Sequence, residues 1–241
     1  MCPSVQSRGT IKRREKRETE SLEVSPVDRT PKVPTPSLNR LPLYYRYLLE
    51  AREQRLSIVS SEMLGDAAGV PAAQVRKDLA YLGEFGRPGI GYDVAEMQRR
   101  LGQQLGLATE REVIVVGAGR LGSAISSYGG FATYGLSVAA IFDKDRSRIG
   151  SKVGNLEVRD VHTLGEFVKE RSIQIAILAV PAPAAVEVAK EMVKAGITAI
   201  LNFAPAKLEV PAGVVVSNED LAARLATLMF RMTHGQPIPA T

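Results

Sequence analysis

Residues 113–131 read VIVVGAGRLGSAISSYGGF. Four β-branched residues lead directly into a Gly-x-Gly-x-x-Gly motif, and a helix-compatible stretch follows it. A strand, a tight glycine turn and a helix N-terminus in this order can bind the pyrophosphate of a dinucleotide, because backbone N–H groups and the positive end of the helix point at one spot. Most such motifs belong to dehydrogenases, so an NAD-dependent oxidoreductase is the first hypothesis to test.

The residues after the glycine motif extend it into a larger α/β domain. A second strand, LSVAAIFD, ends on Asp143 about twenty residues past the glycine loop. An acid at this point accepts hydrogen bonds from the adenosine ribose and repels a 2′-phosphate, which favours NAD(H) over NADP(H). Lys144 and Arg146 argue against this preference, or are only solvated loop charges. IQIAILAVPAPAAVEVAKEMVKAG predicts a third strand and its crossover helix, and ITAILNFAP and GVVVS predict further strands of a doubly wound parallel sheet.

Composition limits the classes of protein that fit. The chain has 241 residues and 45% hydrophobic content, enough for two small domains with their own cores. No apolar run approaches the roughly 18 residues of a membrane span, and the first residues are charged where a signal peptide would be apolar, so we expect a cytoplasmic protein with no membrane contact. Cys2 is the single cysteine, which excludes an intrachain disulfide or a cysteine-based metal site.

The net charge of +5 is concentrated near the N-terminus, where residues 1–36 carry 8 basic and 5 acidic side chains. KRREKRETE and SPVDRTPKVPTP mix charges and prolines without hydrophobic periodicity, so this tail is expected to be disordered. It is interpreted as a solvated extension, with a weak DNA-tethering arm as the alternative.

Helical spacing starts after the tail. LNRLPLYYRYLLEAREQ predicts a helix that begins near 39–43 and buries one face, formed by Leu41, Tyr44, Tyr45, Leu48 and Leu49. In VSSEMLGDAAGVPAAQVRKDLAYLGEF, Ser60 or Ser61 caps a short helix that ends near Ala68, Gly69 makes a turn, and Pro71 opens a second helix. Two short helices joined by a glycine turn form a helix-turn-helix.

The second of these helices has an outward face suited to the major groove of DNA. Val75, Leu79 and Leu82 fall together and face the core, whereas Lys77 lies nearly opposite. The residues beside Lys77 include two alanines and a few long donors, which allow close approach to base edges. An ordinary solvated face is the alternative reading of this helix.

The next segment, GEFGRPGIGY, contains four glycines around Arg87 and predicts the wing of a winged helix. Asp93, with Glu96 three residues later, then caps a closing helix. The residues expected to bind DNA are Ser60, Ser61, Gln74, Arg76, Lys77, Tyr81, Arg87, Gly89 and Tyr92.

The sequence does not provide the groups that the oxidoreductase hypothesis requires. Hydride transfer needs a substrate domain and usually an acid or base near the nicotinamide, but the other domain here is a winged helix. The only histidines are His162, in an expected loop, and His234, beyond the last helix, and both fit structural or solvated roles. No catalytic constellation and no metal site is expected, so the protein is not expected to be an enzyme.

The last expected helix, NEDLAARLATLMFRM, is apolar over more than half of its circumference. Its main face is formed by Leu221, Leu225, Leu228, Met229 and Met232. Such a helix needs more cover than the edge of one small domain supplies, so burial in a second subunit is expected, with packing between the domains of its own chain as the alternative.

Together, SSEMLGDAAGVPAAQVRKDLAYLGEFGRPGIGY, GAGRLGSAISSYGGF and ILNFAPAKLEVPAGVVVSNEDL resemble the bacterial redox-sensing repressor family Rex over about 37–232. The resemblance implies an α/β fold with an N-terminal winged-helix domain, a Rossmann-type doubly wound parallel sheet, and a C-terminal helix swapped onto the partner of a homodimer. The expected divisions are a tail at 1–36, the winged helix at 37–107, the NAD(H) domain at 108–217, and the last helix and tail at 218–241.

By position, the resemblance makes Tyr128 the tyrosine near the nicotinamide and makes Arg46 and Asp220 an interdomain charged pair. Where many relatives have Phe after this aspartate the chain has Leu221, so an aromatic contact is not carried over. The residues expected to bind NAD(H) are Gly117, Ala118, Gly119, Arg120, Leu121, Gly122, Tyr128, Asp143, Val180, Pro181 and Asn202.

The dinucleotide is therefore expected to be an effector rather than a substrate. The resemblance implies a repressor of fermentative and respiratory genes that binds palindromic double-stranded operator DNA and is released when NADH accumulates relative to NAD⁺. The alternatives are an oxidoreductase with an appended helix-turn-helix, and a winged-helix regulator whose effector is another adenine nucleotide or coenzyme A.

Overall fold

The computed structural model describes residues 33–87 and 89–235. Most of the expected N-terminal tail, with Cys2, and the last six residues of the chain lie outside the described residues.

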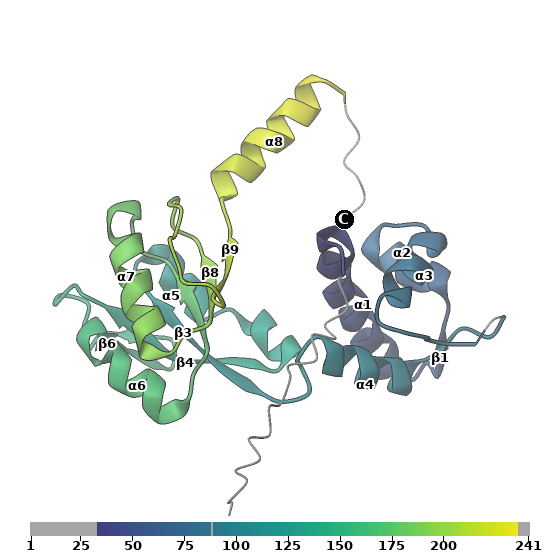
Figure 1. Ribbon diagram of the computed structural model, residues 1–241, viewed down its shortest axis with the longest axis horizontal. Helices are drawn as coiled ribbons and strands as arrows, with labels where there is room; N and C mark the ends of the chain where they lie inside the picture. Colours follow the sequence, from purple (N-terminus) through teal and green to yellow (C-terminus); the bar gives the residue numbers. More distant parts are fainter. Residues whose placement is uncertain (1–32, 88, 236–241) are drawn as a thin grey trace, which may run out of the picture. The chain divides into compact units, whose positions relative to one another are not determined.

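The N-terminal helices and strands form a winged-helix unit (Figure 1). Its elements are α1 (Thr35–Glu53), β1 (Ile58–Val59), α2 (Ser61–Ala68), α3 (Ala72–Ala80), β2 (Tyr92–Asp93) and α4 (Val94–Gln104). β1 pairs antiparallel with β2, so the segment between α3 and β2 forms the wing. The core includes Leu41, Tyr44, Leu48, Leu64, Val75, Leu79, Met97 and Leu101, all at most 2% exposed.

Two local predictions of helix ends are confirmed in this unit. The side chain of Ser60 accepts a hydrogen bond from the backbone N–H of Met63 and caps α2, and Asp93 accepts one from the backbone N–H of Glu96 and caps α4. Gly69 ends α2 in the left-handed conformation, with φ of 65°, which glycine adopts without steric cost.

The predicted start of the first helix at 39–43 is wrong, because α1 begins at Thr35. Pro36 lies in the first turn, where a missing N–H costs nothing. Pro42 lies inside the helix and does not end it. The expected boundary at residue 36 therefore falls within α1.

The second unit is a seven-stranded sheet in the order β5-β6-β4-β3-β7-β8-β9. Its strands are β3 (Arg111–Val116), β4 (Leu136–Asp143), β5 (Lys152–Val153), β6 (Leu156–Asp160), β7 (Ile175–Leu178), β8 (Ala199–Asn202) and β9 (Val215–Asn218). All pairs are parallel except the β5-β6 hairpin, which the sequence patterns did not predict. The chain order reverses between β3 and β7, the position at which doubly wound sheets bind their ligands.

Helices cover both faces of this sheet (Figure 1). α6 (Leu164–Arg171) and α7 (Ala182–Ala195) pack on the face that carries Ile114 and Phe142, whereas α5 (Arg120–Ser126) and the 3₁₀ helix η1 (Gly129–Tyr134) follow the glycine loop on the other. A second 3₁₀ helix, η2 (Val161–Thr163), precedes α6, and α8 (Leu221–Thr233) ends the described chain.

Candidate functional site

The outward face of α3 is arranged as the helical pattern predicted. Val75 and Leu79 are buried, whereas Ala73, Arg76 and Lys77 are exposed. Ala80 is exposed too, and Gln74 and Tyr81 are half-buried at the sides of this face. The small side chains and long cations together give a surface that can approach a polyanion closely.

A groove of about 830 Å³ runs between the start of α2, the side of α3 and the wing. Six of the nine residues expected to bind DNA line this groove, and they are Ser60, Ser61, Arg76, Arg87, Gly89 and Tyr92. Lys77, Gln74 and Tyr81 lie outside its lining. The sequence therefore selected residues that are far apart along the chain and that share one surface.

Two of these residues, Ser61 and Tyr92, are buried, and their contact with DNA stays a prediction. Tyr92 is 6% exposed and Ser61 is 9% exposed, and their hydroxyl oxygens lie 3.3 Å apart in a shared hydrogen bond. This bond joins α2 to β2 beneath the groove. The hydrogen bond between Ser61 and Tyr92 therefore connects α2 to the strand that follows the wing.

The wing owes its shape to its glycines. The backbone N–H of Arg87 donates to the carbonyl of Gly91 at 2.9 Å, and the N–H groups of Ile90 and Gly91 donate back to the carbonyl of Arg87 at 3.1 Å. A Cβ on Gly91, whose φ is 106°, would lie 2.5 Å from the carbonyl oxygen of Val59. Position 91 therefore requires glycine. The side chain of Arg87 is exposed on the wing.

The sequence patterns missed a buried acid in α3. Asp78 is 0% exposed and accepts hydrogen bonds from the guanidinium of Arg40, the hydroxyl of Tyr44 and the side-chain amide of Gln74. Burial alone would raise the pKa of Asp78, but the hydrogen bonds from Arg40, Tyr44 and Gln74 outweigh burial and lower the pKa to about 2. The same carboxylate raises the pKa of Arg40 through their hydrogen bond. Its position three residues after Val75, on the buried face, is the one local signal that could have identified Asp78.

In the second unit, the glycine loop has the backbone geometry that the motif requires. Gly117 has a φ of 108°, and a Cβ on Gly122 would overlap the carbonyl oxygen of Gly117, so α5 packs directly on the loop. Gly119 differs, because its φ is −69° and a Cβ there would meet only Arg148, at 3.6 Å. Gly117 and Gly122 are therefore required by the fold, whereas the space beside Gly119 is open.

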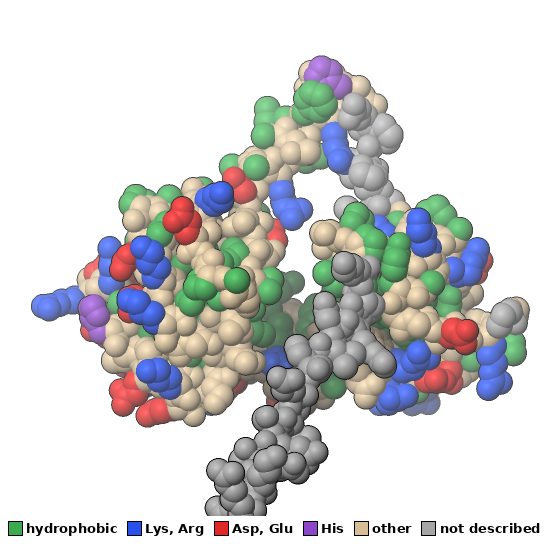
Figure 2. All heavy atoms as spheres, viewed as in Figure 1, with side chains coloured by type: hydrophobic (Ala, Val, Ile, Leu, Met, Phe, Trp, Pro, Cys, Tyr) green, Lys and Arg blue, Asp and Glu red, His purple; other side chains and the backbone are tan. Residues whose placement is uncertain are grey.

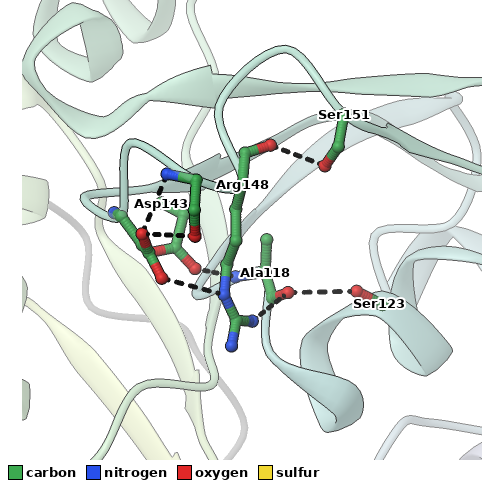
Figure 3. Close-up of polar contacts among 7 residues, drawn as sticks. Ala118, Ser123, Asp143, Arg148 and Ser151 are labelled. Carbon is green, nitrogen blue, oxygen red and sulfur yellow. Dashed lines mark hydrogen bonds and ion pairs between the residues drawn. The ribbon is translucent and has the colours of Figure 1, made fainter.

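Asp143 and Arg148 hold the loop from the end of β4 (Figure 3). Asp143 accepts hydrogen bonds from the backbone N–H of Ala118 at 2.8 Å and of Asp145 at 2.9 Å. Arg148 donates to the carbonyl of Ala118 at 2.6 Å and pairs with Asp145 at 3.4 Å. Each carboxylate oxygen of Asp143 has a further lone pair for an outside donor. The sequence patterns missed Arg148, for which the basic run after Asp143 is the only signal.

These features fit a dinucleotide. The first N–H groups of α5, from Arg120 to Gly122, have no partner within the helix, the space at Gly119 is open to a close approach, and Arg148 places a cation beside it. Val180 and Pro181 follow β7 at the neighbouring strand end, and Val180 lies against Gly117.

Asn202 is buried within the fold, and its contact with the cofactor stays a prediction. It is 1% exposed. Its amide nitrogen donates to the carbonyl of Ala206 at 3.0 Å and to the side chain of Asn218 at 2.8 Å, and its oxygen accepts from the backbone N–H of Ala204. Both N–H groups are used within the fold, so Asn202 ties the ends of β8 and β9 together.

The three residues expected to form a switch are all exposed. Tyr128 is 63% exposed and its ring stands edge-on to Phe131 at 5.3 Å. Arg46 lies 3.9 Å from Glu50 on α1, and both side chains are about half exposed. Asp220 accepts a hydrogen bond from the backbone N–H of Ala223 at 2.9 Å and therefore caps α8.

The apolar face of α8 has no cover within the described residues of the single chain, and Figure 2 shows hydrophobic side chains along it. The exposed fractions are 55% for Leu221, 62% for Leu225, 44% for Leu228, 66% for Met229, 55% for Phe230 and 81% for Met232. An apolar surface of this kind marks an interaction site.

The remaining candidates for chemistry are few. His162 and His234 are both exposed. Within residues 33–87 and 89–235, no group of three or more His, Cys, Asp or Glu side chains could hold a metal ion. In the same part of the chain no helix is both long and apolar enough to cross a membrane.

A winged helix joined to a doubly wound sheet with a glycine-rich loop defines a DNA-binding regulator with a nucleotide-binding domain. Residues 32–80 match a family model described as the N-terminus of putative DNA-binding proteins, and residues 108–206 match a CoA binding domain.

Curated relatives are named "Redox-sensing transcriptional repressor Rex". That of Carboxydothermus hydrogenoformans is 44% identical over 83% of this chain and 97% of its own length, and that of Streptomyces coelicolor is 42% identical over 85% of this chain and 80% of its own. The chain belongs to the Rex family of redox-sensing transcriptional repressors.

Solved structures agree with this assignment. A crystal structure of RSP in complex with β-NAD⁺ and operator DNA matches with a TM-score of 0.78 at 38% identity, covering 85% of this chain and 94% of that one. A structure of RSP in complex with β-NADH matches with a TM-score of 0.73 at 36% identity, covering 86% and 97%. These similarities confirm the predicted fold class and the prediction of a repressor rather than an oxidoreductase.

Proposed function

We propose that this protein represses transcription by binding palindromic operator DNA and that NADH binding releases it. The observation that carries the proposal is the match, over 85% of this chain, to a repressor crystallised with both β-NAD⁺ and operator DNA. The winged helix supplies DNA binding and the doubly wound sheet supplies the redox input. Operator DNA and NADH meet in the cytoplasm, where we place its action.

The DNA surface consists of the exposed face of α3 and the wing. Lys77 and Arg76 face the major groove, where Arg and Lys donate to guanine, and Arg87 reaches a phosphate or the minor groove from the wing. The hydroxyl oxygen of Ser60 accepts the hydrogen bond that caps α2, so it has a role within the fold as well as at this surface. Two such surfaces in a symmetric dimer recognise half-sites about one helical turn apart.

The glycine loop and the end of β4 hold NAD(H). The pyrophosphate lies at Gly119 and the N-terminus of α5, with Arg148 as the nearby cation, and Asp143 accepts hydrogen bonds from the adenosine ribose. The described contacts of Asp143 with the loop leave lone pairs for the ribose. Asp143 also repels the 2′-phosphate of NADP(H).

The dimer forms through α8, whose exposed apolar face packs on a second subunit. In that dimer, Asp220 of the partner pairs with Arg46 in the DNA-competent state. NADH brings the nicotinamide near Tyr128, whose hydroxyl then bonds Asp220 and breaks the charged pair. A ligand shifts two states only if it binds them with different free energies, and the oxidised ring, which is positive, differs from the neutral reduced ring near such charges.

Operator binding measured with and without nucleotides tests the proposal. NADH should weaken binding of the full-length protein to a palindromic duplex, NAD⁺ should weaken it much less, and Lys77→Ala and Arg87→Ala should each weaken it by about 1–3 kcal/mol for a base contact. Competition with coenzyme A tests the other effector class that the matched domain family suggests. Release of operator DNA by coenzyme A but not by NADH would overturn the redox assignment. Oxidation of NADH in the presence of carbonyl substrates would instead support the oxidoreductase hypothesis.

A further inference from the structure

The contacts of Gln74 bear on which base the recognition helix reads. Gln74 is half-buried at the side of the exposed face of α3, and its amide nitrogen donates to Oδ1 of Asp78 one helical turn away, at 2.8 Å. Oε1 of Gln74 makes no hydrogen bond within the described residues, and no buried side-chain oxygen there lacks a partner. One end of the side chain is therefore tied to Asp78, and Oε1 is accessible to an outside donor.

The carboxylate of Asp78, which accepts from Gln74, also accepts three hydrogen bonds from α1. Oδ1 of Asp78 also accepts from Nη2 of Arg40 at 2.8 Å, and Oδ2 accepts from Nε of Arg40 at 2.6 Å and from the hydroxyl of Tyr44 at 2.7 Å. Arg40 and Tyr44 belong to α1, so the amide of Gln74 is fastened through Asp78 to a different helix.

The chemistry of an ionised carboxylate decides the orientation of the amide. Carboxylate oxygens accept hydrogen bonds and cannot donate them, so Gln74 must present its NH₂ group, and not its oxygen, to Asp78. A free glutamine can exchange its oxygen and nitrogen by a half-turn and so match either a donor or an acceptor. Gln74 cannot make this turn without facing two oxygens toward each other at hydrogen-bond distance.

We propose that Gln74 reads one base of each half-site by accepting, through Oε1, a hydrogen bond from an exocyclic amino group, and that Asp78 is the positioning residue that fixes this acceptor. In the major groove such a group is N6 of adenine or N4 of cytosine, whereas guanine and thymine present only acceptors there for hydrogen bonding. The proposal rests on the assignment of α3 as the recognition helix.

The base preference of the full-length protein tests this directly. Selection from duplexes with a randomised half-site should give, for the wild type, one position restricted to adenine or cytosine, and Gln74→Ala should lose that restriction while the other positions keep theirs. Removal of the amino group at that position, with purine in place of adenine or 2-pyrimidinone in place of cytosine, should weaken the wild type by about 2-fold to 10-fold. The same analogue should not weaken Gln74→Ala.

Asp78→Asn separates positioning from simple stability. An Asn side chain can both donate and accept, so Gln74 regains its half-turn, and the same position should then tolerate guanine or thymine. A purely structural role would instead weaken binding at all positions alike. If Asp78→Asn does not fold, the binding of wild type and Gln74→Ala to duplexes that lack the amino group still tests whether Gln74 reads the base.

Equal sensitivity of the wild type and Gln74→Ala to loss of the amino group would overturn the inference. Lys77→Ala distinguishes this outcome from failure of the proposed function. If Lys77→Ala relaxes a different position, the recognition helix stands and only the role of Gln74 is wrong. If the wild type itself selects no sequence, the proposed function fails.

Discussion

Replacement of Asp78 by Asn also has a calculable effect on stability. Asp78 is fully buried, and its pKa is about 2 in the folded protein against about 3.9 in an unfolded chain. This difference contributes about 2.6 kcal/mol to the free energy of unfolding at neutral pH. Since the folded pKa is the lower of the two, the contribution is complete above the unfolded pKa and is lost as the pH falls toward 2, with about half of it gone at pH 3.

We therefore expect Asp78→Asn to be less stable than the wild type by about 2.6 kcal/mol or more at pH 7, with a difference in stability that narrows as the pH is lowered. Urea unfolding followed by circular dichroism from pH 7 to pH 3 measures the gap, at one fixed protein concentration because a dimer gains stability with concentration. The other carboxylates titrate in both proteins, so their effects largely cancel.

Asp66→Asn is the matched control, because Asp66 is an exposed carboxylate of the same domain. It should change stability by less than about 0.5 kcal/mol. A gap between Asp78→Asn and the wild type that stays constant from pH 7 to pH 3 would show that the ionised carboxylate does not support the fold in this way.

Three further predictions concern the ligand, the switch and the dimer. Gly119→Val should abolish NADH binding in calorimetry while leaving operator binding intact, since the backbone of Gly119 is not left-handed and its side-chain space is open; wild-type NADH affinity would contradict the Rossmann assignment. Asp220→Ala should lower the free energy of unfolding by about 1 kcal/mol, because it removes the N-cap of α8. Asp220→Asn keeps a capping side chain and removes only the charge. Weaker release from the operator by NADH in both variants would support the switch, and normal release in Asp220→Asn would refute it. Met229→Glu, at a side chain that is 66% exposed, should yield monomers in analytical ultracentrifugation. Thr227→Glu is its control, because Thr227 lies with Arg224 and Arg231 on the polar side of α8, and an unchanged dimer in Met229→Glu would exclude the apolar face as the interface.

The sequence by itself determined the features whose causes are local. Gly69 and Gly117 adopt positive φ angles, at 65° and 108°, as a turn and a glycine loop require. Ser60 and Asp93 cap helices three residues ahead, and the strand that ends on Asp143 has the predicted bounds. In each case the physical requirement involves neighbours within a few positions, so a pattern of residue types is enough to reveal it.

Only the tertiary structure decided which polar residues face outward. Asp78 meets Arg40 across 38 residues, Ser61 meets Tyr92 across 31, and Arg148 meets Ala118 across 30. A buried polar group is stable only where a partner satisfies its hydrogen bonds, and a partner so distant along the chain leaves no trace in local spacing. The sequence patterns therefore selected Ser61, Tyr92 and Asn202 by residue type and did not predict the internal hydrogen bonds that these side chains make.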